Sequence, residues 1–279
     1  MTVFLFPNKT KDTDLSVTCS AVRLLRDFGA HILMEPEYSE WIGPDAAYLP
    51  VGEGIAAADV VITVGGDGTL LRAANECLRD GKPVLGINLG RTGFLATCEV
   101  PQMAAKLKRL TAGEYRLEQR SLLRAESNTG WQATALNDVV LYSRSRQHPM
   151  DYAVYCDGIF VGGFRSDGVI VATPTGSTAY SLSAGGPILD VTASVFVMTA
   201  ICPHGGQTAP LVFSSERHLK VLSAPGNRDD VMTSADSQSS CVLAAGDWAD
   251  IYTAEQKLSY IVFDEAEQFR AIENKLTRR

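Results

Sequence analysis

The sequence of 279 residues lacks the features that would assign it to a membrane, to nucleic acid or to a zinc site. It has no stretch close to the roughly 20 apolar residues of a membrane-spanning helix. Its formal net charge of −7 disfavours nonspecific binding to nucleic acid, which needs a basic surface. The six cysteines form no Cys-x-x-Cys pair, and no histidine lies at zinc-ligand spacing from one. We therefore expect reduced thiols in a cytoplasmic protein that binds neither a membrane nor nucleic acid.

The composition that is present is that of a globular protein. Apolar residues make up 46% of the chain and charged residues 20%, which is enough to build a core. Domains usually hold about 100–200 residues, so the length predicts two of them. The start, Met1–Phe6, has no basic flank and meets Pro7 at once, which favours a short buried strand over a signal peptide.

The first hundred residues alternate between apolar runs and segments with helical spacing. Helices are expected at Leu15–Phe28 and Thr69–Leu78, and strands at Val3–Phe6, Ile32–Met34, Val60–Val64 and Pro83–Ile87. Residues 35–54 hold three prolines and three glycines and predict a long irregular loop. This alternation predicts a Rossmann-like α/β domain with a mostly parallel sheet over residues 1–100.

The pattern changes after Gly113, where short alternating runs replace the helical spacing. Asp157-Gly158 lies between two of these runs and is the strongest hairpin signal in the chain. We expect a β-rich, sandwich-like domain over residues 101–263. Helical spacing returns at Glu265–Leu276, so residues 264–279 are expected to complete the first domain.

A glycine-rich turn, Gly65–Thr69, joins a predicted buried strand to the start of a predicted helix. Its glycines let backbone N–H groups approach an anion closely, and the helix N-terminus adds partial positive charge. Asp67 conflicts with phosphate binding unless it binds a hydroxyl proton or a metal ion. The alternative is that Asp67 only caps the helix. The turn alone resembles that of NAD kinases, lipid kinases and phosphofructokinases, and indicates a phosphotransferase.

Three further segments narrow the resemblance. They are the glycine-rich loop Gly86–Leu95, the pair Asn137-Asp138 at the start of a strand, and Arg165–Pro187 with its core Thr173-Pro174-Thr175-Gly176-Ser177-Thr178-Ala179-Tyr180. Together with the turn, they resemble the NAD kinase family over nearly the whole chain. The carboxylates and amides suit ribose hydroxyls, and Phe94 and Tyr180 offer flat faces for stacking, although both could simply pack in the core.

The resemblance implies roles for particular residues. Asp67 would be the catalytic aspartate. Residues implied to contact the dinucleotide are Gly66, Gly68, Arg72, Phe94, Asn137, Asp138, His148, Arg165, Asp167, Thr178, Ala179, Tyr180, Ser181, Leu182, Ser183, Cys202 and Gln238. The family usually has Asn-Glu at the position of Asn137-Asp138, so the carboxylate here reaches one methylene less. No protein ligand for a metal is assigned.

The resemblance also implies an activity. The chain would phosphorylate the adenosine ribose 2′-hydroxyl of NAD to give NADP, with ATP or polyphosphate as donor and Mg²⁺ on the donor phosphates. A homodimer or homotetramer, built through the β-rich domain, is implied as well. Two alternatives remain: a lipid kinase of the same superfamily, and an NAD-binding regulator without catalysis.

Overall fold

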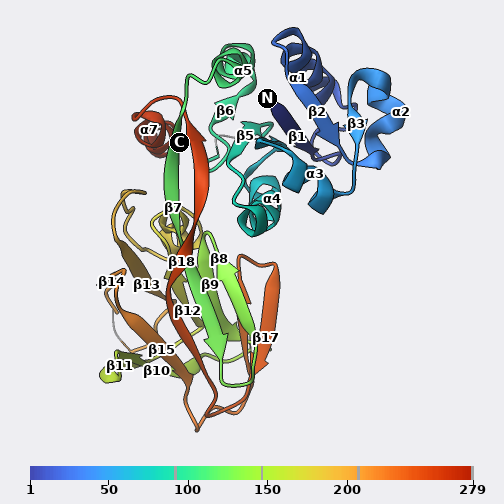
Figure 1. Ribbon diagram of the computed structural model, residues 1–279. Helices are drawn as coiled ribbons and strands as arrows, with labels where there is room; N and C mark the ends of the chain where they lie inside the picture. The colour runs from blue at the N-terminus through green and yellow to red at the C-terminus, as the bar shows by residue number, and fades with distance from the viewer. Residues whose placement is uncertain (91–92, 146, 206–207, 278–279) are drawn as a thin grey trace. The chain divides into compact units, whose positions relative to one another are not determined.

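The chain folds into two compact units, shown in the computed structural model of Figure 1. The structure describes residues 1–90, 93–145, 147–205 and 208–277. The first unit comprises residues 1–119 and the chain from Leu258 onward, and the second comprises Arg120–Lys257. The C-terminal segment therefore returns to the first unit, as the sequence predicts.

A parallel sheet forms the centre of the first unit. Its strands lie in the order β3-β2-β1-β4-β5, and both β6 and the end of β18 also pair with β5 in parallel. The bounds are β1 Thr2–Pro7, β2 His31–Met34, β3 Ala47–Tyr48, β4 Val60–Gly65, β5 Val84–Asn88 and β6 Cys98–Glu99. The expected strands and their parallel arrangement are confirmed, and β4 is buried along its whole length.

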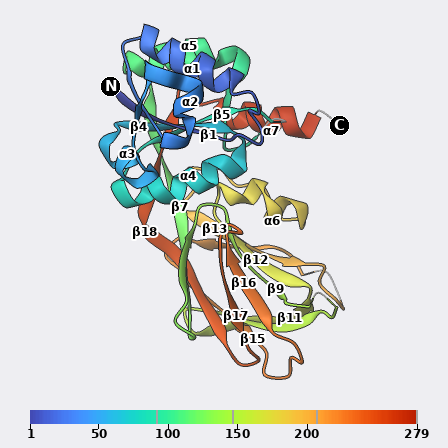
Figure 2. The ribbon, with the colours of Figure 1, turned by 90° about the vertical axis from the view of Figure 1, so that its right-hand side faces the viewer.

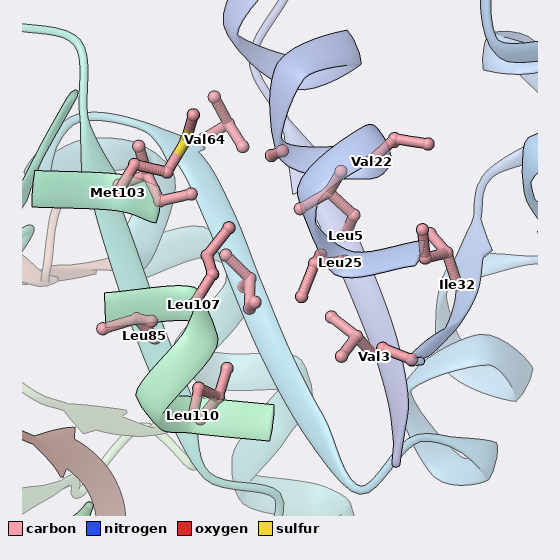
Figure 3. Close-up of a cluster of buried hydrophobic side chains, with 14 of the residues drawn as sticks. Val3, Leu5, Val22, Leu25, Ile32, Val64, Leu85, Met103, Leu107 and Leu110 are labelled. Carbon is pink, nitrogen blue, oxygen red and sulfur yellow. The ribbon is translucent and has the colours of Figure 1, made fainter. Parts of the chain in front are cut away.

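Helices cover both faces of this sheet. Figure 2 shows α1 and α5 on one face and α3 and α4 on the other. Their bounds are α1 Ser16–Asp27, α3 Val51–Ala57, α4 Asp67–Asp80, α5 Met103–Thr111 and α7 Glu267–Thr277. Figure 3 shows how Val22 and Leu25 of α1 and Leu107 and Leu110 of α5 pack on strand residues such as Leu5. This burial of apolar surface holds the glycine turn at the end of β4 in a rigid frame.

Residues 35–54 are not the irregular loop that their composition predicts. They form short elements, which are η1 Pro36–Tyr38, α2 Ser39–Ile42, η2 Gly43–Asp45, β3 and the start of α3. Pro36 and Pro44 lie in the first turn of the two 3₁₀ helices. A backbone N–H at this position has no acceptor within the helix, so proline, which lacks the N–H, is tolerated there. Proline therefore starts helical turns here. The same holds beyond this segment, where Pro101 lies in the first turn of η3 Val100–Gln102.

The second unit is a sandwich of antiparallel strands. One sheet runs β14-β13-β12-β9-β16-β17, and the other pairs β11, β10, β15 and β18, with β7 beside β18 and β8 beside β7. The bounds are β7 Arg116–Ser127, β8 Gln132–Ala135, β9 Asp138–Ser143, β10 Met150–Cys156, β11 Ile159–Ser166, β12 Gly168–Ala172, β13 Val195–Ile201, β14 Leu211–Ser214, β15 His218–Ser223, β16 Val231–Ala235, β17 Ser239–Leu243 and β18 Trp248–Val262. Tyr152, Val171 and Phe196 are among the side chains buried between the sheets. The β-rich prediction is confirmed, and β7 and β18 contribute residues to both units.

The hairpin between β10 and β11 forms at the predicted dipeptide. Asp157 and Gly158 have φ of 50° and 80°, which is the left-handed pair that a type I′ turn requires.

All six cysteines are free thiols. Among the residues that the structure describes, no helix is both long and apolar enough to span a membrane.

Candidate functional site

The glycine turn joins β4 to α4, and its first two glycines are closely packed. A Cβ on Gly65 would lie 2.3 Å from the hydroxyl oxygen of Thr69, so only glycine fits there. Gly66 is the N-cap of α4, and its carbonyl accepts the N–H groups of Thr69 and Leu70 at 2.9 and 3.1 Å. Within the described chain, the N–H groups of Asp67 and Gly68 have no acceptor. Two backbone donors at the positive end of a 14-residue helix are therefore available to an anion.

Asp67 does not cap its own helix. Its carboxylate accepts three backbone N–H groups from the loop after β5: Phe94 at 3.0 Å to Oδ2, Leu95 at 3.1 Å to Oδ1 and Ala96 at 3.0 Å to Oδ1. A Cβ on Gly93 would lie 2.2 Å from Oδ1, so the loop can approach this closely only with glycine there. The capping alternative is thus excluded. The carboxylate is held in one position by amides 27 to 29 residues away in sequence.

Counted over the described residues, the hydrogen bonds to Asp67 leave it one acceptor position. A carboxylate has about four lone-pair sites, of which Oδ1 uses two and Oδ2 uses one for the loop amides. The side chain is half-buried, and Gly68 beside it is exposed. The remaining site on Oδ2 can therefore accept a single hydroxyl proton from a ligand.

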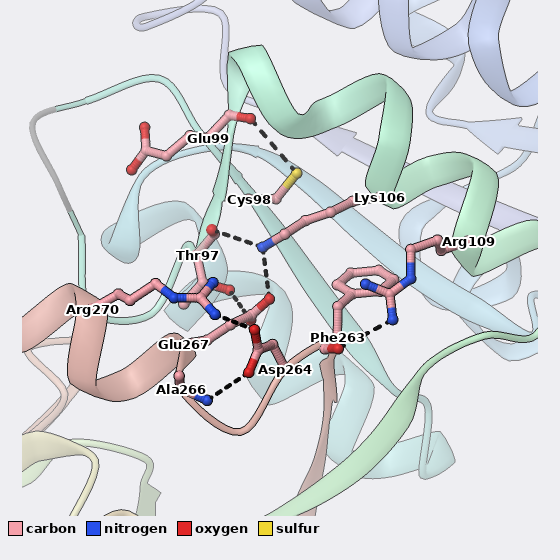
Figure 4. Close-up of polar contacts among 10 residues, drawn as sticks. All are labelled: Thr97, Cys98, Glu99, Lys106, Arg109, Phe263, Asp264, Ala266, Glu267 and Arg270. Atoms are coloured by element: carbon pink, nitrogen blue, oxygen red, sulfur yellow. Dashed lines mark hydrogen bonds and ion pairs between the residues drawn. The ribbon is translucent and has the colours of Figure 1, made fainter.

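A buried ion pair anchors the loop that holds Asp67 (Figure 4). Lys106 of α5 lies 2.8 Å from Glu267 of α7, and their side chains are only 12% and 8% exposed. Lys106 also donates to the carbonyl of Thr97 at 3.1 Å, while the Thr97 hydroxyl donates to Glu267 at 3.1 Å. Thr97 directly follows the three amides, so this cluster fixes the end of the loop.

Other candidates of the first unit surround the turn. Arg72 is exposed on α4, with its guanidinium carbon 5.8 Å from the centre of the Phe6 ring, and Phe94 is half-buried. Lys11, which sequence reasoning missed, places its ammonium beside Gly66. Of the predicted loop Gly86–Leu95, residues 91 and 92 lie outside the described residues.

The second unit brings Asn137 and Asp138 together with a turn at residues 235–238. The Asp236 carboxylate accepts the N–H groups of Leu136, Asn137 and Asp138 at 2.7, 2.9 and 3.0 Å. Gln238, exposed at the end of this turn, donates its N–H to the Ala235 carbonyl. In the described chain, Oδ1 of Asn137 is buried and accepts no hydrogen bond. A buried acceptor without a donor is costly, and it fits a group that a ligand supplies.

Asp138 has an environment that disfavours its charged form. Its side chain is 7% exposed, and Asp236 lies nearby. Burial, followed by the charge of Asp236, raises the pKa of Asp138 to about 7. Burial also raises the pKa of Asp236, although three backbone donors oppose that shift. Strongly perturbed carboxylates are typical of binding and catalytic sites.

The threonine-rich segment packs directly on Asn137. A Cβ on Gly176 would lie 1.9 Å from the Asn137 carbonyl oxygen, so this contact requires glycine. Residues 176–178 form η4 and residues 180–183 form α6. Tyr180 is 47% exposed, whereas Ser181 is fully buried and its hydroxyl bonds that of Thr199 at 2.9 Å. Thr178, Ala179 and Leu182 are half-buried, and Ser183 is exposed.

A second group of candidates gathers at the opposite end of β12. Asp138 pairs with Ala172, whereas Asp167 precedes Gly168, so the length of the strand, roughly 13 Å, separates the two groups. In this second group, the backbones of His204 and Arg165 form an isolated antiparallel β-bridge. The Nε2 atom of His204 lies 3.8 Å from Oδ1 of Asp167. Exposed Cys202 has a φ of 46°. His148 is exposed and, in the described chain, forms no hydrogen bond or ion pair with the other candidates.

Comparisons with known proteins agree over nearly the whole chain. The ATP-NAD kinase N-terminal domain matches residues 51–115, and the ATP-NAD kinase C-terminal domain matches residues 136–263. NAD kinase of Caldanaerobacter subterraneus subsp. tengcongensis is 34% identical over 281 residues, covering 99% of each chain. NAD kinase of Nitrosococcus oceani is 43% identical over 198 residues, which are 70% of this chain and 68% of its own.

Solved structures show the same architecture. An NAD kinase from Archaeoglobus fulgidus in complex with ATP superposes with a TM-score of 0.80 at 27% identity, covering 99% of each chain. Yeast NADH kinase complexed with NADH has a TM-score of 0.89 at 24% identity, covering 100% of this chain and 88% of its own, and this likeness concerns the fold. The two family matches and the full-length relative lead to one conclusion: the chain belongs to the NAD kinase family.

Proposed function

We propose that this protein transfers the γ-phosphoryl group of ATP to the 2′-hydroxyl of the adenosine ribose of NAD, giving NADP and ADP. Family membership supports the reaction. The observation that carries the mechanism is the Asp67 carboxylate, fixed by three loop amides with one acceptor position left. Polyphosphate is the second donor to test, because a turn that binds phosphate oxygens does not by itself require a nucleoside.

Asp67 acts as the proton acceptor in this proposal. The 2′-hydroxyl donates a hydrogen bond to the open position on Oδ2, and its oxygen attacks the γ-phosphorus. One oxygen–phosphorus bond forms, the bond to the ADP oxygen breaks, and the proton passes to Asp67 and then to solvent. The N–H groups of Asp67 and Gly68 bind donor phosphate oxygens. Phosphoryl transfer depends mainly on such positioning and charge stabilisation, and Gly66 and Arg72 line the same turn.

The second unit supplies the dinucleotide contacts. Asn137 offers its buried Oδ1 to an amide or hydroxyl donor, and Asp138 and Gln238 lie on the adjoining segments. The exposed ring of Tyr180 suits stacking on a base, as does Phe94 of the first unit. We propose that residues 178–183 line the adenosine end, with the buried hydroxyl of Ser181 fixing the turn through Thr199.

The proposal also includes the second group of candidate residues, at the Gly168 end of β12. Arg165 and Asp167 are exposed charged residues two positions apart in sequence, and Cys202 and His148 are exposed as well. We assign these residues to NAD as well, because a dinucleotide is long and has polar groups at both ends.

The residues present are suited to a divalent cation that is bound to the phosphates of ATP and not to a set of protein ligands. Among the described residues, no three His, Cys, Asp or Glu side chains gather into a cage for a metal ion. Both oxygens of Asp67 already accept backbone hydrogen bonds. Mg²⁺ on the ATP phosphates would neutralise their charge, while the amides of the turn orient them.

Oligomeric state and compartment are further parts of the proposal. β11 is an edge strand of its sheet, and it exposes Ile159 by 72% and Phe160 by 58%. Exposed apolar side chains on an edge strand favour association, so we propose a homodimer or homotetramer formed through the second unit. Six free thiols favour a reducing, cytoplasmic location.

The two alternatives are less well supported. A lipid kinase would need an apolar cleft for an acyl chain, whereas residues 165–187 are rich in glycine and hydroxyl groups, and the chain matches both ATP-NAD kinase domains. A regulator without catalysis would not need a carboxylate held at the phosphate turn.

Replacement of Asp67 by asparagine tests the mechanism. The amide keeps the size of the side chain but cannot take a proton, so we expect kcat to fall roughly 10²- to 10⁴-fold with NAD affinity retained. Asp80→Asn, at the other end of α4, is the matched control. NADP formation from ATP or polyphosphate would be followed by a coupled dehydrogenase. Near-normal turnover of Asp67→Asn would remove Asp67 from the proposed role.

A further inference from the structure

The short loop between β1 and α1 carries four charged residues, and three of them have structural partners. Asp14, at its end, accepts the N–H of Ser16 at 3.1 Å. Lys9 lies 4.4 Å from the centre of the Trp41 ring and 3.8 Å from the Glu37 carboxylate. Asp12 accepts the Thr18 N–H and hydroxyl at 2.8 and 2.6 Å, which fixes the start of α1. Lys11 is exposed, and in the described part of the chain no carboxylate pairs with it.

Lys11 places its ammonium on the glycine turn. A Cβ on Gly66 would lie 2.4 Å from Nζ of Lys11, and a Cβ on Gly90 would lie 3.5 Å from it. Nζ is therefore packed against the backbone of two glycines, one in the turn before α4 and one after β5. Glycine at position 66 is what allows the ammonium to come so close.

The loop is tied to the turn independently of Lys11. The Asn8 side-chain amide donates to the hydroxyl of Thr69 at 2.8 Å, and the Asn8 carbonyl accepts the N–H of Lys11 at 3.0 Å. Asn8 thus links the loop to the first turn of α4. The position of the Lys11 backbone follows from this anchor, so the ammonium stays near the turn even though its side chain is exposed.

We propose that Lys11 binds the phosphate chain of the donor nucleotide. A positive charge without a carboxylate partner, held beside the free N–H groups of Asp67 and Gly68, forms a site for phosphate oxygens with contributions from two segments of the first unit. An ammonium on a flexible stem is well suited to phosphate, which it binds as a point charge. This inference rests on the proposed function and adds a donor-binding residue to it.

The test compares two lysines of the same loop. Lys11→Met removes the charge at the turn, and Lys9→Met removes an equal charge that is engaged with Tyr38, Trp41 and Glu37. We expect Lys11→Met to raise KM for ATP roughly 10- to 100-fold and to leave KM for NAD within about twofold. Lys11→Arg should restore most of the ATP affinity. Lys9→Met should leave KM for ATP close to the wild-type value.

Direct binding separates a donor contact from a structural effect. Calorimetric titration with ATP and with inorganic tripolyphosphate should show the same loss for Lys11→Met, whereas NAD binding and the thermal unfolding temperature should be unchanged. Salt should weaken ATP binding less in Lys11→Met than in the wild type. Unchanged KM for ATP, or a rise in KM for NAD instead, overturns the assignment. Absence of NADP formation by the wild type would instead refute the proposed function.

Discussion

Replacing Lys106 by methionine should destabilise the first unit and impair catalysis together. Methionine keeps the length of the apolar stem but leaves Glu267 as a buried charge with no cation beside it. The carbonyl of Thr97 also loses its donor. Because the Thr97 side chain and carbonyl are both held by this pair, the loop that binds Asp67 should loosen.

The magnitude follows from burial. Removing one partner of a buried ion pair costs about 3 to 5 kcal/mol, and the slight exposure of both groups favours the lower end. About 3 kcal/mol corresponds to a fall of roughly 6–12 °C in the unfolding temperature of a chain of this size. A shift of the carboxylate by about 1 Å can cost as much as 10² in rate, so we expect kcat to fall roughly 10- to 100-fold.

Urea unfolding and steady-state kinetics on four proteins would check both parts. They are the wild type, Lys106→Met, the double variant Lys106→Met/Glu267→Leu, and Lys108→Met as a control on the exposed face of α5. The double variant also removes the unpaired, buried carboxylate of Glu267, so it should regain most of the stability. It should regain little of the activity, because Thr97 still lacks both of its hydrogen-bond partners. The reasoning is refuted if Lys106→Met loses less than about 1 kcal/mol, or if its kcat is unchanged.

Three further outcomes are expected. The folded chain keeps a proton on Asp138 up to about pH 7 that the unfolded chain loses near its ordinary pKa of 3.8, so stability falls as pH rises between these values. Between pH 5 and pH 8, Asp138→Asn should remove up to about 3 kcal/mol of that fall, measured by urea unfolding at the two pH values. Gly93→Ala should lower kcat at least tenfold in NADP assays, because its Cβ meets the Asp67 carboxylate, while Gly162→Ala, which meets nothing within 4 Å, should not; equal kcat values would contradict this. Ile159→Lys should shift the oligomer towards monomer in light scattering, and an unchanged mass would exclude β11 from the interface.

Local features of the sequence predicted the strand and the glycine turn that position Asp67, and the hairpin of the second unit. Val60–Val64 is apolar except for Thr63 because β4 is buried on both faces, and glycine follows at position 65, where a Cβ would meet the Thr69 side chain. Asp157-Gly158 marked its hairpin for an equally local reason, which is the left-handed backbone of both residues. Signals of this kind need no knowledge of distant residues.

Contacts between distant segments could not be predicted. The amides that hold Asp67 come from the loop after β5, and the Thr97–Glu267 bond joins residues 170 apart in sequence. Asp236 has no distinguishing signal in the sequence, because a carboxylate in a polar loop is common, yet it accepts the backbone N–H groups of Leu136, Asn137 and Asp138. Helix α5 carried a readable signal, since Met103, Leu107 and Leu110 have helical spacing and all are buried.

The sequential order of the two units bears on how the protein is made. The second unit lies between two parts of the first, and β18, the pair partner of β5 at Tyr260, is followed by α7 with Glu267. During synthesis from the N-terminus, the intervening sandwich is complete before the ribosome releases the residues that close the parallel sheet. The amides around Asp67 therefore gain their anchor last. In a nascent or prematurely terminated chain that lacks Glu267, the loop that holds the Asp67 carboxylate would be without this anchor. We therefore expect no activity until both units are finished.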